Sequence, residues 1–453
     1  MRDRNFSMRC ARSTLPLCAL VVAASMSRTA LALPSLAQQT GQPCAMCHVG
    51  GFGPQLTPFG RAFKIGGYTL AVPDTHAIPI AAMLVTSYTQ TKADQPDDAG
   101  PHHGPNNNFS LQEASLFYAG RISDHLGAFA QATYSDIDRH LTLDNVDVRY
   151  AHALTFAEKP LVLGASINNN PTVQDAWNTL PGWRFPYMAS ELVPGMAAAP
   201  LIEGGLEHQV IGLSAYAYYN SRWYAELGGY RSLSHGFLNT VNVEDSVGRI
   251  AGVAPYWRIV YSRDNGGMSW SLGAFGLDAR LHPDRLPGPT NKFRDIGVDA
   301  SLQWVNGPHV IALNGAYTHE HQNRAASFAS GAAENPTADL NSTALNASYY
   351  YAGHYGVTLA RFDTRGSRDD GLYAPATASG SRTGKPNSAG TILQADWTPF
   401  GAADSWRAPW ANLRIGVQYT VYDKFNGAAR NYDDFGRNAR DNNTLFLFLW
   451  LAI

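Results

Sequence analysis

Hydrophobic and polar residues alternate along much of the chain with the two-residue period of a β-strand. In residues 411–423, one face carries Leu413, Ile415, Val417, Tyr419 and Val421, and the other carries Arg414, Gly416, Gln418 and Thr420. Residues 145–150 and 295–304 repeat the pattern with charged residues on the polar face. A water-filled lumen tolerates a charge at every second position, whereas the core of a β-sandwich does not. The pattern therefore predicts strands with one face toward lipid and the other toward a lumen.

Sixteen segments between residues 80 and 453 show this alternation, and single-chain bacterial barrels have an even number of strands. Short turns, such as 123–124 and 307–308, alternate with long loops, such as 92–107 and 169–207. Short turns of such barrels face the periplasm and long loops face the outside. We predict an all-β fold, a 16-stranded antiparallel transmembrane β-barrel in the outer membrane of a Gram-negative bacterium. Its first strand would begin, and its last strand end, at the periplasmic side.

The composition agrees with a barrel and argues against a helical membrane protein and against a nucleic-acid-binding protein. Hydrophobic residues make up 45%, charged residues 15%, and there are 42 glycines. The chain after residue 32 has no apolar run long enough for a membrane helix. The net charge of −2 gives no basic excess, so we expect no nucleic-acid partner.

The N-terminus resembles a secretory signal peptide. Arg2, Arg4, Arg9 and Arg12 precede an apolar run at 15–24, and Ala30-Leu31-Ala32 is a small-x-small cleavage site. We divide the chain into a signal peptide at 1–32, a short segment at 33–75 and a barrel at 76–453.

The short segment contains the run Cys-Ala-Met-Cys-His at residues 44–48. Cys10 and Cys18 fall in the signal peptide, so Cys44 and Cys47 are the only thiols expected in the exported protein. C-x-x-C-H is typical of covalent attachment of one haem c, with His48 as the proximal iron ligand. The alternative is a redox or structural C-x-x-C pair with an unrelated histidine beside it.

The segment at 33–75 has about 40 residues, and a chain that short rarely builds its own core. We therefore predict that it plugs the lumen, entering from the periplasmic side. Thr57-Pro58 predicts a helix at 58–64, with Phe59 and Phe63 on one face to cover a haem edge. Arg61 and Lys64 are candidate partners of the haem propionates, or lie on a solvated face.

The second axial ligand of a haem iron is left open by the sequence. His76 and Met83 are the nearest candidates, and Met188 in the long loop is a third; each also has an ordinary structural interpretation. Aromatic residues of that loop pack either on the plug or on the loop itself. Histidines at 102–103 and at 319 and 321 are weak metal candidates, and the strand parity of the second pair points outward.

The signal peptide, the single C-x-x-C-H segment and the barrel together resemble the fused monohaem cytochrome–porin family of the outer membrane, which includes iron-oxidising outer-membrane cytochromes. The local match covers Gln-Thr-Gly-Gln-Pro-Cys-Ala-Met-Cys-His at 39–48, Leu-Thr-Pro-Phe-Gly-Arg-Ala-Phe-Lys at 56–64 and Gly67-Tyr68. A second match is Asn-Asn-Pro-Thr-Val-Gln-Asp-Ala-Trp-Asn at 169–178, followed by Pro-Gly-Trp-Arg-Phe-Pro at 181–186. The resemblance implies an outer-membrane location and electron transfer.

Two functions follow as hypotheses. In the first, an outer-membrane cytochrome takes electrons from an extracellular donor, with Fe(II) as one candidate, and passes them to a periplasmic c-type cytochrome or another carrier. If Fe(II) is that donor, the protein would be an Fe(II)-oxidising oxidoreductase. In the second, the protein is a porin for small solutes whose plug carries a structural haem. Acidic residues expected on the lumen face, to attract a cation, are Asp147, Asp295, Asp299 and Asp423.

Overall fold

The computed structural model describes residues 34–73 and 78–453. Sixteen long strands account for most of this part of the chain. They are β1 (Ile80–Thr91), β2 (Asn108–Arg121), β3 (Leu126–Tyr134), β4 (Leu141–Phe156), β5 (Lys159–Asn168), β6 (Val210–Tyr219), β7 (Trp223–Ser232), β9 (Ala254–Asp264), β10 (Met268–His282), β11 (Asn291–Asn306), β12 (His309–Asn323), β13 (Thr337–Tyr351), β14 (Tyr355–Gly366), β15 (Ser388–Trp397), β16 (Asn412–Lys424) and β17 (Thr444–Ala452). A two-residue strand, β8 (Arg249–Ile250), pairs with the end of β10.

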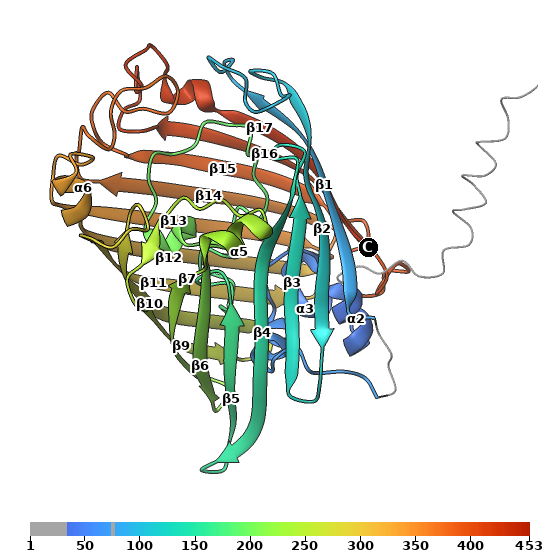
Figure 1. Cartoon of the computed structure of the whole chain (residues 1–453). Coiled ribbons are helices and arrows are strands. Elements are labelled where there is room, and N and C mark those ends of the chain that lie inside the picture. Colours follow the sequence, from blue (N-terminus) through green and yellow to red (C-terminus); the bar gives the residue numbers. More distant parts are fainter. Residues whose placement is uncertain (1–33, 74–77) are drawn as a thin grey trace, which may run out of the picture.

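The long strands close into a barrel (Figure 1). Each pairs antiparallel with the next in the sequence, and β7 pairs directly with β9. The ring is closed by the two ends of the chain, because β1 pairs antiparallel with β17 from Met83 opposite Ala452 to Thr91 opposite Thr444. The predicted sixteen-strand antiparallel barrel is confirmed.

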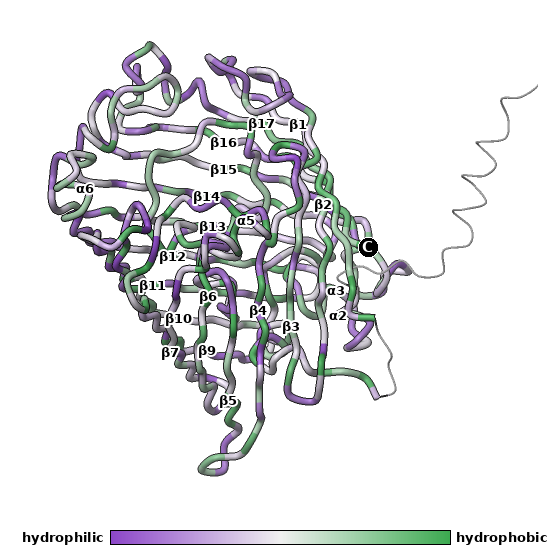
Figure 2. The backbone as a smooth tube through the Cα atoms, in the orientation of Figure 1, coloured by the Kyte–Doolittle hydropathy of each residue, from purple (hydrophilic) through white to green (hydrophobic). Residues whose placement is uncertain are grey.

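Side chains alternate between the two faces of the barrel wall as the sequence predicts. On β11, Asp295 and Asp299 are 1% and 4% exposed, whereas Ile296 and Val298 between them are 50% and 53% exposed. Figure 2 shows this alternation as changes of colour along the strands. Asp423 is an exception to our prediction, since it lies on the outer face, exposed and paired with Arg361. Asp423 has the same odd-numbered parity as the outward-facing residues of β16. The alternation along the strand therefore determines its face, whatever its charge.

Several charged side chains of the lumen face form ion pairs with one another. Arg149 lies 2.7 Å from Asp147, and Arg414 lies 3.0 Å from Asp396, all four side chains being at most 1% exposed. Buried charges require such pairing, because an isolated charge out of water is costly. These positions are therefore enclosed by protein rather than bathed in a wide channel.

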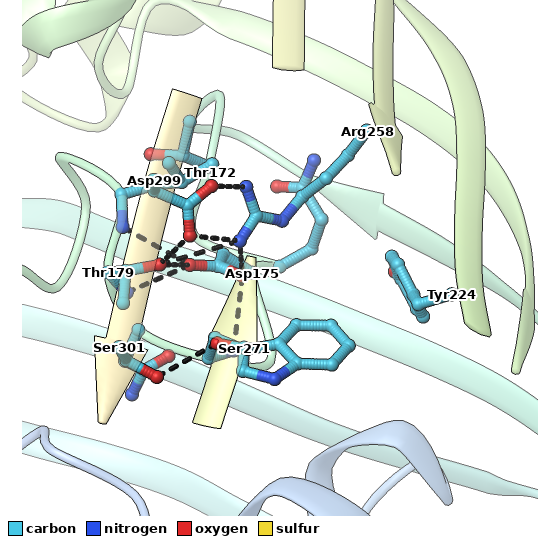
Figure 3. A network of polar contacts seen from close by, with 12 residues as sticks. Thr172, Asp175, Thr179, Tyr224, Arg258, Ser271, Asp299 and Ser301 are labelled. Carbon is cyan, nitrogen blue, oxygen red and sulfur yellow. Dashed lines mark hydrogen bonds and ion pairs between the residues drawn. The ribbon is translucent and has the colours of Figure 1, made fainter. Parts of the chain in front are cut away.

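The connection between β5 and β6 folds into the barrel, and we call residues 169–209 the lumen loop. Its Asp175 is fully buried and lies 3.0 Å from Arg258, which also bonds Asp299 of the wall at 2.9 Å (Figure 3). Thr179 Oγ1 donates to Asp299 at 2.6 Å. Farther along, η2 (Leu201–Gly205) is held by wall carboxylates that accept its backbone N–H groups. The loop is thus fastened to the wall at several points.

Residues 34–73 form α2 (Pro34–Thr40), α3 (Cys44–Cys47), η1 (Val49–Gly51) and α4 (Pro58–Ile65). Several wall side chains donate hydrogen bonds to backbone carbonyls of this segment. They are Gln303 to Leu56 at 2.8 Å, Asn412 to Gly51 at 2.8 Å, Arg414 to Phe52 at 2.6 Å and Tyr216 to Ile65 at 2.6 Å. Gln39 of α2 accepts from the backbone N–H of Arg121, beside the short turn after β2. The segment therefore contacts lumen-facing side chains around the ring, nearer the short-turn end.

The remaining short helices are α5 (His235–Thr240), α6 (Ala325–Ala329) and η3 (Ala439–Asn442), all in connections at the long-loop end. Within residues 34–73 and 78–453, no helix is long and apolar enough to cross a membrane. The predicted signal peptide at 1–32, the segment boundary at 75–76 and the candidate ligand His76 lie outside the described residues.

Candidate functional site

The C-x-x-C-H run folds as one helical turn followed by extended backbone. The turn is α3, and the backbone N–H of His48 donates to the carbonyl of Cys44 at 2.8 Å. His48 then takes φ −118° and ψ 132°, so the chain leaves the helix at this residue. Cys44, Cys47 and His48 all line one cavity of about 380 Å³. The structure thus brings the three predicted site residues together on one side of this cavity.

Helix α4 packs against the helical turn that carries the two cysteines. It begins as predicted, with Thr57 as the N-cap that accepts from Gly60 N–H at 3.2 Å, and with Pro58 at the first helical position. The backbone N–H of Thr57 donates to the carbonyl of Cys47 at 2.9 Å. A Cβ atom on Gly60 would lie 2.3 Å from that carbonyl, so only glycine permits this approach. Helix α4 is therefore packed directly on the cysteine turn.

The cavity is lined mainly by apolar side chains from the segment, the barrel wall and the lumen loop. Its aromatic lining consists of Phe52, Phe63, Tyr68, Phe117, Phe129, Trp183, Tyr187 and Trp450. Phe63 of α4 lines it as expected, whereas Phe59 is not among the lining residues. Phe52 and Trp450 pack against each other with ring centroids 4.7 Å apart and ring planes tilted by 56°. An apolar cavity with a few polar groups is the usual form of a cofactor site.

Burial controls the protonation of the three predicted residues. Burial, together with the nearby guanidinium of Arg414, lowers the pKa of His48 to about 4. His48 is therefore neutral at pH 7, which is the form that binds a metal. Burial raises the pKa of Cys44, and burial together with Cys44 raises that of Cys47 to about 12. Both thiols are free, without a disulfide between them.

His48 has an unsatisfied nitrogen. Its Nδ1 is buried and has no hydrogen-bond partner among the described residues. A buried polar atom without a partner costs free energy comparable to a lost hydrogen bond, unless a bound group supplies the partner. A group bound beside His48 would supply such a partner.

Two of the three candidate distal ligands line the same cavity. Met83 reaches it from β1, where its side chain is 7% exposed and faces the lumen as parity predicts. Met188 reaches it from the lumen loop. Met46 is 43% exposed and is not among the lining residues. The cavity therefore offers a thioether on a second element, whichever of the two methionines is used.

The two basic residues of α4 have different surroundings. Lys64 lines the cavity, and its Nζ donates to the carbonyl of Val173 at 2.8 Å and to Asn178 Oδ1 at 3.0 Å. Burial lowers the pKa of Lys64 to about 7, with Arg149 contributing. Arg61 is buried elsewhere, against Ser269 of the wall. Only Lys64 is placed to meet an acidic group inside the cavity.

The lumen loop packs on the N-terminal segment. Trp183 lies under the ammonium of Lys64, with 5.2 Å between Nζ and the ring centroid. Tyr187 is hydrogen-bonded to Gln55 at 3.4 Å. Trp177 instead packs on wall tyrosines, including Tyr224 with ring centroids 5.2 Å apart. Of the two alternatives for the loop aromatics, packing on the segment therefore holds for Trp183 and Tyr187.

Sequence reasoning did not identify three charged residues that also line the cavity, Glu113, Asp144 and Arg184. Asp144 lies 3.0 Å from His208, and Arg184 is paired with Glu203 at 2.5 Å. Glu113 reaches the lumen because the β1–β2 register shifts between Val85 and Thr86. A bulge inserts an extra residue into a strand, so counting alternate residues across it assigns those beyond it to the wrong face.

The histidine pairs form no metal cluster in the described part of the chain, which has no group of three or more His, Cys, Asp or Glu side chains arranged for a metal ion. His103 is buried and lies 3.7 Å from Asp136. His319 and His321 face outward, as their parity predicts, and contact Asp339.

Comparisons with known proteins add little beyond the fold. No protein-family model matches the chain, and no curated protein matches it. Solved structures with similar folds include an anion-selective porin from Comamonas acidovorans, with 12% identity and a TM-score of 0.45 over 82% of this chain and 98% of that one. Others are OmpF of Salmonella typhi in complex with daunomycin (10% identity, TM-score 0.42, 83% and 97% covered) and OmpT of Vibrio cholerae (9%, 0.41, 83% and 96%).

Proposed function

We propose that this protein is an outer-membrane c-type cytochrome that passes electrons from an extracellular donor to a periplasmic carrier. One observation carries the proposal: the only two cysteines of the described chain and the histidine that follows them line one largely apolar cavity inside the barrel. The orphaned Nδ1 of His48 supports a bound group there. These residues fit a covalently attached haem, which when bound supplies one-electron redox chemistry.

Each residue has a role in this proposal. Cys44 and Cys47 would hold the group covalently, and neutral His48, together with Met83 or Met188, would bind its iron. Lys64 is positioned to meet a propionate, and its contacts with Val173 and Asn178 fix its direction. The aromatic lining would limit contact between the bound group and water, which is one of the ways in which a protein tunes a redox potential.

Residues 34–73 act as a plug in this proposal. Their hydrogen bonds to wall residues on several strands, and the lumen loop packed on them, support this role. The donor approaches from the long-loop side, and the carrier docks at the short-turn side, where α2 lies beside the end of β2. Fe(II) is one donor to test, because oxidation outside the cell keeps insoluble ferric product outside as well.

The purified full-length protein provides the test. Wild type should retain haem peroxidase staining on a denaturing gel, and the double variant Cys44→Ala, Cys47→Ala should lose it. Stopped-flow mixing with Fe(II), ferrocyanide and a hydroquinone then measures reduction of the haem by each donor. If the protein carries no covalent haem, the cytochrome proposal fails. If only Fe(II) fails, the iron donor is excluded and electron transfer stands.

A second candidate function is a channel for small solutes, favoured by the closed sixteen-strand barrel with polar lumen-facing positions. Planar-bilayer conductance distinguishes the two. Steady ion flow through the wild-type protein, together with a haem that no outer donor reduces, would favour the channel. A poorly conducting protein with a reducible haem would favour the cytochrome.

A further inference from the structure

The outer face of the barrel carries an excess of basic side chains at the long-loop ends of neighbouring strands between β7 and β11. We define the basic patch as Arg231 on β7, Arg249 on β8, Arg280 on β10, and Lys292 and Arg294 on β11. All five side chains are exposed or half-buried and lie at outward-facing positions. Equivalent outward positions on β2, β5 and β6 carry Phe109, Ile167 and Ile211, which are 79%, 46% and 44% exposed.

The patch contains two basic side chains that repel each other, and a bound anion would relieve this repulsion. Arg280 of β10 stands directly opposite Lys292 of β11 in the strand register, and both face outward. Like charges at directly opposed positions of a sheet repel each other. Asp278 lies 3.3 Å from Lys292 and 3.2 Å from Arg294, and it is the one carboxylate paired with patch residues in the described chain. One carboxylate among five basic groups leaves a clear positive excess.

The position of the patch along the membrane normal indicates which layer of the membrane surrounds it. Trp304 at the short-turn end of β11 is 39% exposed, as expected of an aromatic residue at the periplasmic interface. Arg294 lies ten residues away along the same strand, with Ile296 and Val298 exposed between them. Ten residues of strand span about 33 Å, or about 25 Å along the membrane normal at a tilt of roughly 40°. That is the thickness of the apolar band, so Arg294 reaches the outer headgroup layer.

We propose that the basic patch binds the phosphate groups of a phosphorylated glycolipid in the outer leaflet. Guanidinium groups bind phosphate oxygens in bidentate geometry, and neighbouring phosphates neutralise the repulsion between Arg280 and Lys292. The lipid's acyl chains would continue onto the apolar strand surface formed by residues such as Ile296 and Val298. This binding is independent of the haem proposal, because the patch lies on the opposite face of the wall from the cavity.

The test uses the detergent-solubilised full-length protein and two probes, fluorescent bis-phosphorylated lipid A and the same lipid with both phosphates removed. The variant Arg249→Gln, Arg280→Gln, Lys292→Gln removes the centre of the patch. The matched control, Lys159→Gln, Arg222→Gln, Arg263→Gln, removes three exposed basic residues at the short-turn end. Heat-modifiable migration on gels verifies that each barrel is folded.

We expect wild type and the control variant to bind the phosphorylated lipid at least about tenfold more tightly than the dephosphorylated one, with the difference shrinking as salt rises. The patch variant should lose the difference. Equal affinity of wild type for both lipids, or an equal loss in the control variant, would overturn the proposal. Should the triple variant fail to fold, Arg280→Gln alone relieves the repulsion and should still reduce phosphate preference. If the patch variant changes only the oligomeric state in native mass spectrometry, the patch is a contact between copies instead.

Discussion

His48 and Met83 line the same cavity from two different parts of the structure, the end of the cysteine turn and the first strand of the barrel. His48 belongs to the segment inside the ring, whereas Met83 belongs to the ring itself and pairs with the last strand at Ala452. A group held by both would connect the segment to the wall. Removal of each residue is therefore expected to have a distinct effect.

Replacement of His48 with alanine should leave haem attached through Cys44 and Cys47 but remove its proximal ligand. The absorption spectrum should change from six-coordinate low-spin to high-spin iron, and rapid reduction by outer donors should be lost. Barrel folding, followed by heat-modifiable gel migration, should be unchanged because the strands do not depend on this side chain. An unaltered haem spectrum would contradict the assignment of His48.

Leucine in place of Met83 or Met188 tests the distal ligand without a large change of volume. The variant that lacks the true ligand should lose the ferric methionine–iron absorption band and have a lower reduction potential, because a methionine ligand raises the potential of haem iron. The other variant should keep both properties and serves as the control. Retention of the band in both variants would exclude both methionines.

Gly60→Ala should lower the amount of covalent haem in the purified protein. The new Cβ would lie 2.3 Å from the carbonyl of Cys47, so α4 must move away from the cysteine turn. Gly236→Ala is a matched control, since a Cβ there meets no atom within 4 Å. Haem content is measured by the pyridine haemochrome spectrum per mole of protein. Equal haem content in the two variants would show that the contact is not required.

Arg258→Gln should loosen the lumen loop. The substitution leaves Asp175 and Asp299 buried without their cation, and breaking a buried pair in this way costs about 3–5 kcal/mol. Limited proteolysis should then cut within residues 169–209 faster than in the wild type. Arg361→Gln is the control, because the exposed pair between Arg361 and Asp423 contributes at most about 1 kcal/mol. Equal protection of the loop in both variants would argue against Arg258 as its anchor.

Deletion of residues 34–73 should raise ion conductance in planar bilayers if the segment closes the lumen. The full-length double variant Cys44→Ala, Cys47→Ala separates the segment from its haem and should conduct poorly. Unchanged conductance after the deletion would mean that the lumen loop alone closes the barrel.

Much of the barrel follows from residue order alone. Strand parity correctly assigns Asp295 to the lumen and Ile296 to the outer face, because the side-chain period of two holds along a regular strand. Parity also places His319 and His321 outside, and the prediction for Asp423 failed where charge was weighed above parity. The C-x-x-C-H run also predicts which three residues meet at one cavity, since they lie close together in the chain, and their binding of a haem stays a prediction.

The rest of the cavity depends on contacts that residue order does not contain. Glu113 enters the lumen through a register shift between β1 and β2, and a bulge leaves no local signal in one sequence. Trp450 and Met188 meet the segment only because the barrel closes at β17 and the lumen loop turns inward. The choice between Met83 and Met188 depends on the same long-range packing.

The pairing of β1 with β17 also imposes an order on assembly. The segment that precedes β1 contacts Trp450 near the end of the chain, and both Phe52 and Met83 pack in the same cluster. The ring can close only after the last strand has been synthesised and exported. Under the proposed function, a haem bonded to Cys44 and Cys47 would be attached before the ring closes around the segment, so haem attachment would precede completion of the barrel.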